Sequence, residues 1–244
     1  MTQAPRHRLD QLLVERGLAE SRAKAQALIL AGEVLVDGKK AAKAGHAVAA
    51  DARIEVLRPP RYVGRGGLKL EAALEEFHID VRGRVCADIG ASTGGFTDCL
   101  LQHGAAHVYA VDVGTGQLDW KLRNDPRVTV REGINARYLQ REDVGEAVDL
   151  AVMDVSFISA TLVVPAAMAL LKDTGEMVIL VKPQFEAGRG QVGKGGIVRE
   201  PEIQAQACER VAKRVEEAGF RTSVIDSPIL GAEGNKEFLL YARH

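Results

Sequence analysis

The chain has 244 residues, of which 46% are hydrophobic and 27% are charged, the composition of a globular protein in water. No apolar run approaches the roughly 18 residues that a membrane helix needs, and residues 1–10 lack the apolar stretch of a secretory signal, so a membrane-spanning chain is excluded and a cytoplasmic location is expected. The net charge of −1 conceals an asymmetry, because residues 1–69 hold 13 Lys and Arg against 7 Asp and Glu, whereas the remainder holds 19 against 26. The basic end is therefore the candidate binder of a polyanion.

The first 40 residues predict two short amphipathic helices followed by a β-hairpin. Gly17 ends the first helix, Ser21 is a typical N-cap for the second, and Gly32 ends that one. Asp37-Gly38 is a strong signal for a hairpin turn. The apolar positions of these elements are Leu9, Leu12, Leu13, Ala25, Leu28, Ile29 and Val34–Val36.

This segment resembles the S4 domain, a small RNA-binding fold. The matching residues are Arg8-Leu9-Asp10, Ser21-Arg22, Ala25, Ile29, Gly32, Val34 and Val36-Asp37-Gly38. The resemblance implies an RNA-binding domain over residues 1–58, whose cations would contact phosphate. The candidate RNA contacts here are Arg8, Arg22, Lys24 and Lys43.

A basic stretch rich in Pro and Gly, RPPRYVGRGG, follows at residues 58–67. Proline and glycine interrupt regular structure, so we predict a linker over 59–67 that joins the S4-like domain to a second domain over 68–244. Arg65 in this linker is a further candidate RNA contact.

From residue 85 onward, short apolar runs alternate with helical patterns at the spacing of βαβ units. The runs predict seven strands, at 85–89, 108–113, 128–130, 150–155, 177–181, 223–225 and 238–241. The first five are rich in Val and Ile, as strands buried on both faces should be. The predicted fold is therefore α/β and Rossmann-like, with a mostly parallel sheet.

The turn after the first of these strands favours a nucleotide-like cofactor. Its glycines follow the spacing GxxxGG from Gly90, rather than the GxGxxG that suits a dinucleotide, so a cofactor without a diphosphate, such as S-adenosylmethionine, is favoured. Asp112 ends the second strand 22 residues later, where a carboxylate can accept hydrogen bonds from ribose hydroxyls. Asp88 is expected near the methionine end. The candidate cofactor residues are Asp88, Gly90, Ala91, Ser92, Gly94, Phe96, Asp112, Val113, Asn135 and Asp154.

Four charged residues are candidates for catalysis. Asp154 and Lys182 each end an apolar strand, so both should emerge at the carboxyl edge of the sheet, where open α/β sheets bind ligands. Together with Lys69 and Glu237 they are similar, in kind and in order, to the Lys-Asp-Lys-Glu tetrad of ribose 2′-O-methyltransferases of the FtsJ/RrmJ type. The resemblance implies a class I methyltransferase domain.

The chemistry of such a reaction requires a base, because a ribose hydroxyl is a weak acid and a weak nucleophile. A neutral lysine serves if burial and a neighbouring cation lower its pKa, so we predict Lys182 as the general base with Lys69 nearby. Asp154 would position Lys182, and Glu237 would support Lys69.

Two segments outside the tetrad are further candidates for ligand contact. The glycine-rich residues 184–200 follow the predicted base and include Arg189, Lys194 and Arg199, so they are a lid or an irregular loop. Arg137 follows the third strand and is a candidate phosphate contact. The three cysteines and six histidines lack ligand spacing, so no metal site is expected.

Along essentially its whole length the chain is similar to the TlyA family, on the motifs GASTGGFTD, VDVGTGQL, NARYL, DVSFIS, VKPQFEAGRGQVG and GNKEFLL. The resemblance implies 2′-O-methylation of cytidine in 16S ribosomal RNA, 23S ribosomal RNA or both, with ribosomal RNA or ribosomal subunits as partners. Three alternatives stay open: an NAD-dependent oxidoreductase, an S4-type assembly factor without methyl transfer, and the haemolysin whose name the family also carries.

Overall fold

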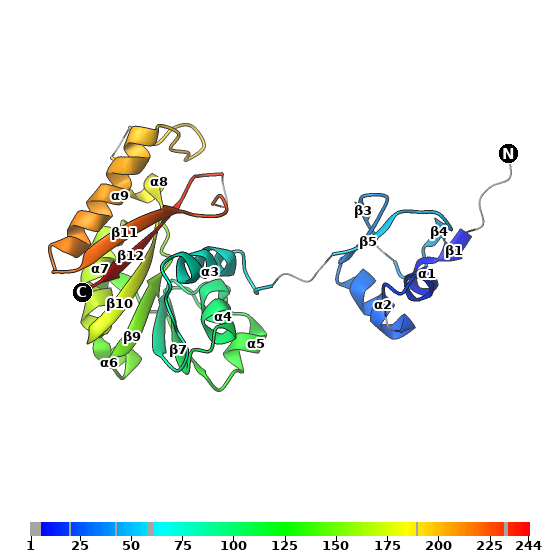
Figure 1. Ribbon diagram of the computed structural model, residues 1–244, viewed down its shortest axis with the longest axis horizontal. Helices are drawn as coiled ribbons and strands as arrows, with labels where there is room; N and C mark the ends of the chain where they lie inside the picture. Colours follow the sequence, from blue (N-terminus) through cyan, green and yellow to red (C-terminus); the bar gives the residue numbers. More distant parts are fainter. Residues whose placement is uncertain (1–5, 20, 42, 58–60, 189, 232–233) are drawn as a thin grey trace. The chain divides into compact units, whose positions relative to one another are not determined.

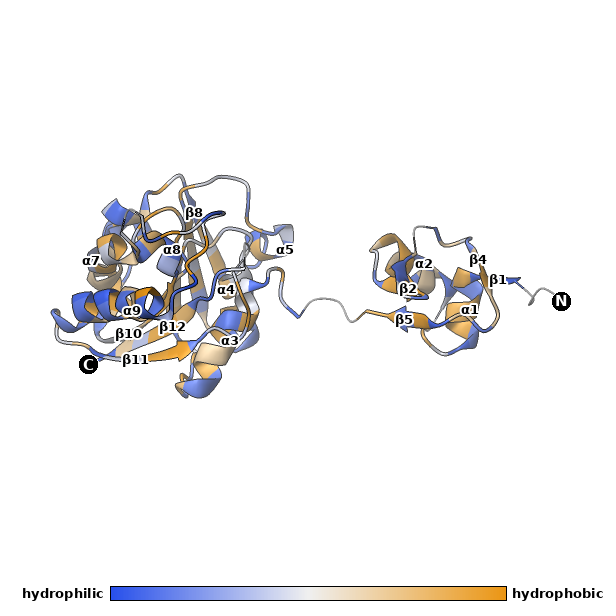
Figure 2. Cartoon of the chain, turned by 90° about the horizontal axis from the view of Figure 1, so that it is seen from above, coloured by the Kyte–Doolittle hydropathy of each residue, from blue (hydrophilic) through white to orange (hydrophobic). Residues whose placement is uncertain are grey.

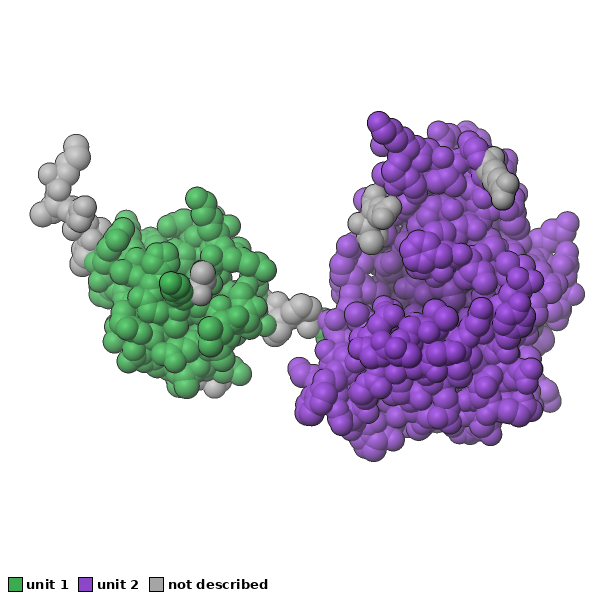
Figure 3. All heavy atoms as spheres, turned by 180° about the vertical axis from the view of Figure 1, so that it is seen from behind, with its two compact units in different colours: residues 1–61 green, residues 62–244 purple. Residues whose placement is uncertain are grey.

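The computed structural model describes residues 6–19, 21–41, 43–57, 61–188, 190–231 and 234–244. The chain divides into two compact units, residues 1–61 and residues 62–244, which Figure 3 colours separately. Residues 58–60, which hold the end of the predicted S4-like domain and the start of the predicted linker, lie outside the described residues.

The described residues of the smaller unit form two helices and two small sheets (Figure 1). Its elements are β1 (Arg6–Arg8), α1 (Leu9–Glu15), α2 (Arg22–Leu30), β2 (Val34–Val36), β3 (Lys39–Lys40), β4 (Ala47–Ala49) and β5 (Ile54–Val56). β1 pairs with β4, and β2 pairs with both β3 and β5, in each case antiparallel.

The predicted helices and hairpin of this unit are confirmed. Ser21 accepts a hydrogen bond from the backbone N–H of Lys24, as an N-cap should. Asp37 and Gly38 both have positive φ, 49° and 78°, the backbone that a two-residue hairpin turn requires. The strands β1 and β4 were not predicted, because three residues are too few to show an alternating pattern.

The larger unit is built on one seven-stranded sheet, as predicted. In spatial order its strands are β11 (Arg221–Asp226), β12 (Phe238–Arg243), β10 (Leu171–Val181), β9 (Val148–Met153), β6 (Val85–Ile89), β7 (His107–Asp112) and β8 (Val128–Glu132). β12 runs antiparallel to both of its neighbours, β10 and β11, and in the described part of the chain the other strands of this sheet all point the same way. The chain passes from β6 to β7 on one side and later returns to β9 on the other, so the crevice for a ligand lies at the carboxyl end of β6.

Helices cover both faces of this sheet (Figure 1). The helical elements are α3 (Gly66–Glu76), α4 (Gly95–Gln102), α5 (Trp120–Arg123), η1 (Ala136–Tyr138), α6 (Arg141–Val144), α7 (Ala160–Leu170), α8 (Pro183–Glu186) and α9 (Pro201–Glu216). The side chains of α7 and α9 pack on the face that includes Ala87 and Ile89, and those of α3 and α4 on the face that includes Cys86. Hydrophobic colour accordingly follows the strands in Figure 2, while the outer side of α9 is hydrophilic. No helix among the described residues combines the length and the apolarity needed to cross a bilayer.

Several element boundaries differ from the predictions. β7 and β9 end earlier than predicted, at Asp112 and Met153, so Val113 and Asp154 directly follow their strands. β10 begins at Leu171, six residues before its apolar run, because the polar residues 172–176 extend the strand across a register shift. α3 begins at Gly66, so the last two residues of the predicted linker are helical. An added Cβ at Gly67 would lie 2.2 Å from the Tyr62 ring, which explains why glycine rather than a helix former stands there.

Candidate active site

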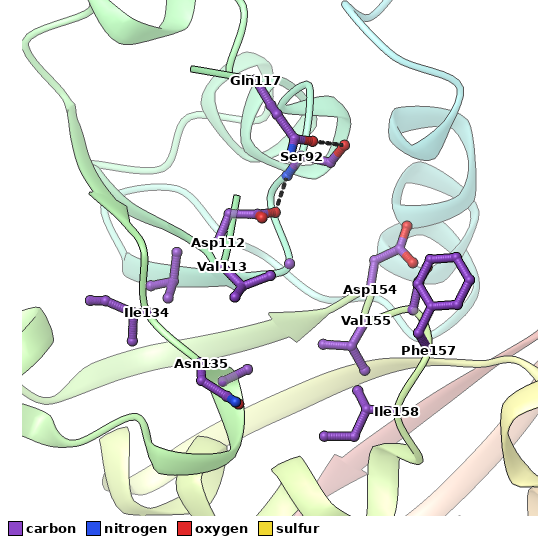
Figure 4. A pocket seen from close by; sticks show the side chains of 14 residues that line it. Ser92, Asp112, Val113, Gln117, Ile134, Asn135, Asp154, Val155, Phe157 and Ile158 are labelled. Carbon is purple, nitrogen blue, oxygen red and sulfur yellow. Dashed lines mark hydrogen bonds between the residues drawn. The ribbon is translucent and has the colours of Figure 1, made fainter. Parts of the chain in front are cut away.

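A cavity of about 540 Å³ opens at the carboxyl ends of β6, β7 and β9 (Figure 4). Its volume lies in the range of small-molecule and cofactor sites. Six of the ten predicted cofactor residues line it, namely Gly90, Ser92, Asp112, Val113, Asn135 and Asp154. The other lining residues were not predicted from the sequence; they are Val111, Gln117, Ile134, Ala136, Val155, Ser156, Phe157 and Ile158.

The close approach of β6 to β9 depends on Gly90. Its φ is +88°, and a Cβ there would lie 2.4 Å from the carbonyl oxygen of Asp154. Gly94 also has positive φ, but a Cβ there would meet Leu118 and Leu122 rather than the cavity. Glycine is therefore required at Gly90 to shape the cavity and at Gly94 to pack the segment after β7.

Asp112 is held by backbone donors at the cavity wall. Its two carboxylate oxygens accept hydrogen bonds of 2.7 Å from the N–H groups of Ser92 and Gly114 (Figure 4 draws the first). The Ser92 hydroxyl in turn donates to Gln117 at 3.3 Å. A carboxylate fixed in this way keeps lone pairs for the hydroxyls of a ligand.

Asp88 belongs to β6, two residues before Gly90, and does not line the cavity. The carboxyl group is fully buried; Thr97 donates to Oδ2 at 2.6 Å, whereas Oδ1 has no hydrogen-bond partner in the described part of the chain. Burial raises the pKa of Asp88 to about 7, and the negative charges of Asp154 and Asp112 add to this effect. A buried carboxylate oxygen without a donor fits a site that receives a cationic ligand group.

A second, smaller cavity of about 180 Å³ adjoins the first. The two share Gly90, Ser92, Asp154 and Ser156, and the smaller one adds the predicted residues Ala91, Phe96 and Lys182. It also adds Gly66, Thr93 and Gly95, which the sequence reading did not include.

Lys182 enters this smaller cavity at the end of β10. Its Nζ forms an ion pair with Oδ1 of Asp154 at 2.5 Å and donates a hydrogen bond to the Ser156 hydroxyl at 2.9 Å. The Lys182 side chain is 11% exposed and that of Asp154 is 23% exposed. The predicted pairing of these two residues is thus seen in the structure.

Lys69 and Glu237 form a second ion pair, with Nζ and Oε2 2.5 Å apart. Both side chains are buried, and neither residue is among those that line the two cavities. Lys69 comes from α3 and Glu237 directly precedes β12, so the pair joins two distant parts of the chain. The four tetrad residues therefore occur as two lysine–carboxylate pairs.

The loop between β9 and α7 carries an exposed aromatic residue at the cavity rim. Phe157 has a φ of +64°, rare for a residue with a bulky side chain, and its side chain is 92% exposed (Figure 4). Its ring lies 5.3 Å from that of Phe185 on α8. The loop is also held at its far end, where Glu186 accepts hydrogen bonds from the Ser159 hydroxyl and the Ala160 N–H. Strain that is fixed from several sides favours a functional role for Phe157.

The predicted RNA contacts are all at the surface. Arg65 donates to the carbonyl oxygen of Leu230, and Arg137 lies 5.7 Å from the centre of the Tyr138 ring, both in exposed positions. In the smaller unit, Lys24 and Lys43 are exposed, and Arg8 and Arg22 are both bonded to Asp10.

The glycine-rich segment, residues 184–200, is held near its end by hydrogen bonds between its backbone and the Asn235 side chain. The Asn235 side chain is buried, accepts from the N–H of Val198 and donates to the carbonyl oxygen of Gly196. Arg189 lies outside the described residues, and Lys194 and Arg199 are exposed. A lid function for this segment stays a prediction.

Comparison with known proteins identifies the family of each domain. Residues 62–244 match the FtsJ-like methyltransferase family and residues 7–54 match the S4 domain. A Mycobacterium tuberculosis protein named 16S/23S rRNA (cytidine-2'-O)-methyltransferase TlyA is 50% identical over 98% of this chain and 91% of its own length. Hemolysin A of Brachyspira hyodysenteriae is 46% identical over 96% of this chain and 98% of its own. A solved structure from Streptococcus thermophilus, described as a candidate hemolysin, has a TM-score of 0.75 at 45% identity and covers 98% of this chain and 88% of that one.

The single antiparallel strand in a seven-stranded sheet, with the ligand cavity at the end of β6, defines a Rossmann-like methyltransferase domain. An S4 domain precedes it in the sequence. The chain belongs to the FtsJ-like methyltransferase family, in the group of relatives that includes TlyA.

Proposed function

We propose that this chain transfers a methyl group from S-adenosylmethionine to the 2′-hydroxyl of a cytidine in 16S or 23S ribosomal RNA, in the cytoplasm. One observation carries the proposal. A cavity of the size of a nucleoside adjoins a smaller cavity, and Lys182, which lines the smaller one, is paired with Asp154, which lines both. The S4 domain supports an RNA substrate, and the name of the M. tuberculosis relative supports cytidine and ribosomal RNA.

The larger cavity is the proposed site of the cofactor. Asp112 would accept hydrogen bonds from its ribose hydroxyls, while Val113 and Asn135 flank its base. The unpartnered oxygen of Asp88 supports a position for the cationic amino group above it, directly or through water. Ser92, with the glycine turn around it, would face the middle of the molecule.

The chain must supply deprotonation and alignment, because S-adenosylmethionine supplies a methyl group that its sulfonium has already activated. We assign Lys182 as the base: its Nζ would accept the proton of the ribose hydroxyl as that oxygen bonds to the methyl carbon, while the bond between this carbon and the sulfonium sulfur breaks and S-adenosylhomocysteine leaves. Asp154 and Ser156 hold Nζ from two directions, and Asp154 stabilises the ammonium that results. Lys182 then releases this proton to water before the next turnover.

Lys69 and Glu237 have a supporting role in this proposal. Their pair is buried at the first turn of α3, and the first residue of this helix, Gly66, lines the smaller cavity. A Cβ at Gly66 would lie 3.9 Å from Oδ2 of Asp154. The pair therefore fixes the element that packs against the proposed base and its partner.

Phe157 is the proposed platform for the target nucleotide. An aromatic ring exposed beside the reacting atoms can stack on an unpaired base, which contributes roughly 1–3 kcal/mol per base. Arg65, Arg137 and the cations of the S4 domain would contact phosphates.

The test is incubation of the full chain with methyl-labelled S-adenosylmethionine and either naked 16S and 23S ribosomal RNA or intact ribosomal subunits. We expect label in RNA, resistant to alkaline cleavage at one cytidine because the 2′-oxygen is blocked. A transcript with a 2′-deoxycytidine at the mapped position is the matched control and should stay unlabelled. Incorporation into no RNA or subunit would refute the enzyme and leave an S4-type assembly factor.

A further inference from the structure

Asp10, near the start of α1, is a fully buried carboxylate in the smaller unit. Arg8 donates to it through Nε and Nη2, at 3.0 Å each, and Arg22 donates through Nε at 2.9 Å. Gln26, one turn after Arg22 on α2, is the third donating residue and adds a fourth hydrogen bond, at 2.9 Å. Hydrogen bonds from Arg8, and from Gln26 and Arg22, hold the pKa of Asp10 well below its usual range despite its burial, so it is charged at physiological pH.

The two arginines that Asp10 binds are themselves half exposed, at 46% for Arg8 and 51% for Arg22. Both bond the same oxygen, Oδ2, so their guanidinium groups lie within a few ångströms of each other. Two cations at that spacing repel unless an anion lies between them. Each guanidinium has five N–H donors, and the bonds to Asp10 occupy only one edge of each group.

We propose that Asp10 is a positioning residue that holds Arg8 and Arg22 as one preformed clamp for a single RNA phosphate. The anion itself never contacts the RNA, because it is buried beneath both guanidinium groups. Its effect is to cancel their mutual repulsion and to fix their rotamers before the RNA arrives, which lowers the entropy cost of binding. This inference rests on the proposed RNA substrate.

The proposal predicts an effect opposite in sign to simple electrostatics. If only net charge mattered, replacing Asp10 with a neutral residue would strengthen RNA binding, since it adds one positive charge to the unit. A positioning role predicts weaker binding, since the guanidinium groups separate. Asp51 offers a matched control, because it is an exposed carboxylate of the same unit.

The experiment measures binding of the full chain to a 23S ribosomal RNA transcript at several salt concentrations, for the wild type, Asp10→Asn and Asp51→Asn. We expect Asp10→Asn to weaken affinity about fivefold and to reduce the slope of log affinity against log salt by about one, the loss of one phosphate contact. Asp51→Asn should bind as well as the wild type or better. Adding Asp10→Asn to an Arg8→Gln/Arg22→Gln chain should cause no further loss. Equal or tighter binding by Asp10→Asn would overturn the proposal.

Circular dichroism and thermal melting check that Asp10→Asn keeps its fold. If it does not, Arg22→Lys replaces it. This change keeps the positive charge but removes the planar guanidinium group, which can donate to Asp10 and to a phosphate at the same time. We expect a severalfold loss of affinity for Arg22→Lys, with Asp51→Asn again as the control that keeps at least the wild-type affinity. Wild-type affinity in Arg22→Lys would refute the clamp. Methyl transfer at saturating RNA separates this inference from the proposed function, since Asp10→Asn should keep kcat and raise only the KM for RNA. A wild type that methylates no RNA refutes the function instead.

Discussion

Replacing Lys182 with methionine tests the proposed base most directly, because methionine has nearly the same length and no proton-accepting nitrogen. Positioned general bases contribute about 10²–10⁴ to a rate, so we expect kcat to fall about 1,000-fold. Asp154 loses its partner but is 23% exposed, so water compensates and the fold should lose no more than about 1 kcal/mol. For a unit of this size that is a fall in Tm of about 2–4 °C.

The assay is single-turnover methyl transfer, with the affinity for S-adenosylmethionine measured separately by calorimetry. Affinity should change less than about threefold, because Lys182 lines the smaller cavity and not the larger one. Lys172→Met is the matched control: Lys172 stands at the other end of β10 and is also ion-paired, with Asp149 at 2.7 Å. A rate within tenfold of the wild type for Lys182→Met, or an equal loss for Lys172→Met, would refute the assignment.

Three further changes test the cavity and its rim. Gly90→Ala should reduce affinity for S-adenosylmethionine at least tenfold and lower Tm by several degrees. The reason is that alanine at a positive φ costs about 1–2 kcal/mol and its methyl group collides with the Asp154 carbonyl. Calorimetry and thermal melting measure the two effects, and an unchanged affinity would contradict the prediction. Burial raises the pKa of Asp88 from 3.8 to about 7, so between these values the folded chain keeps a proton that the unfolded chain releases, and stability from this group falls as pH rises through that window. The difference in Tm between Asp88→Asn and the wild type should therefore be more favourable to the variant at pH 8 than at pH 4. The same difference at both pH values would argue against this. Phe157→Leu should raise the KM for RNA about tenfold with little change in affinity for S-adenosylmethionine, since it removes a stacking surface; an unchanged KM would exclude the stacking role.

The sequence predicted those parts of the fold that depend on local pattern. The seven strands follow from apolar runs, and the hairpin follows from Asp37-Gly38, whose positive φ values are properties of two adjacent residues. β1 and β4 were missed because they are defined by pairing with each other, about 40 residues apart, rather than by their own composition. Long-range pairing of short strands leaves almost no local signal.

The site was predicted only as far as its residues end a strand or open a helix. Asp112, Asp154 and Lys182 could be placed at one edge from strand topology alone. The ring of Phe157 could not, because its exposure follows from a left-handed backbone that two contacts of α8, one by Phe185 and one by Glu186, help to fix. Gly94 shows the opposite case: the motif suggested cofactor binding, whereas the packing of Leu118 and Leu122 is sufficient to require glycine.

The two lysine–carboxylate pairs have different surroundings, and this difference separates their roles. Lys69 and Glu237 are 9% and 4% exposed, so breaking that pair would leave an uncompensated charge in the interior. Asp154 lines both cavities and Lys182 lines the smaller one, so a ligand or water can reach Nζ. A base must exchange protons in every turnover, whereas a buried pair is stable only while both charges stay in place. The accessible pair is therefore the one suited to proton transfer, and the buried pair is suited to holding α3 against the last strand.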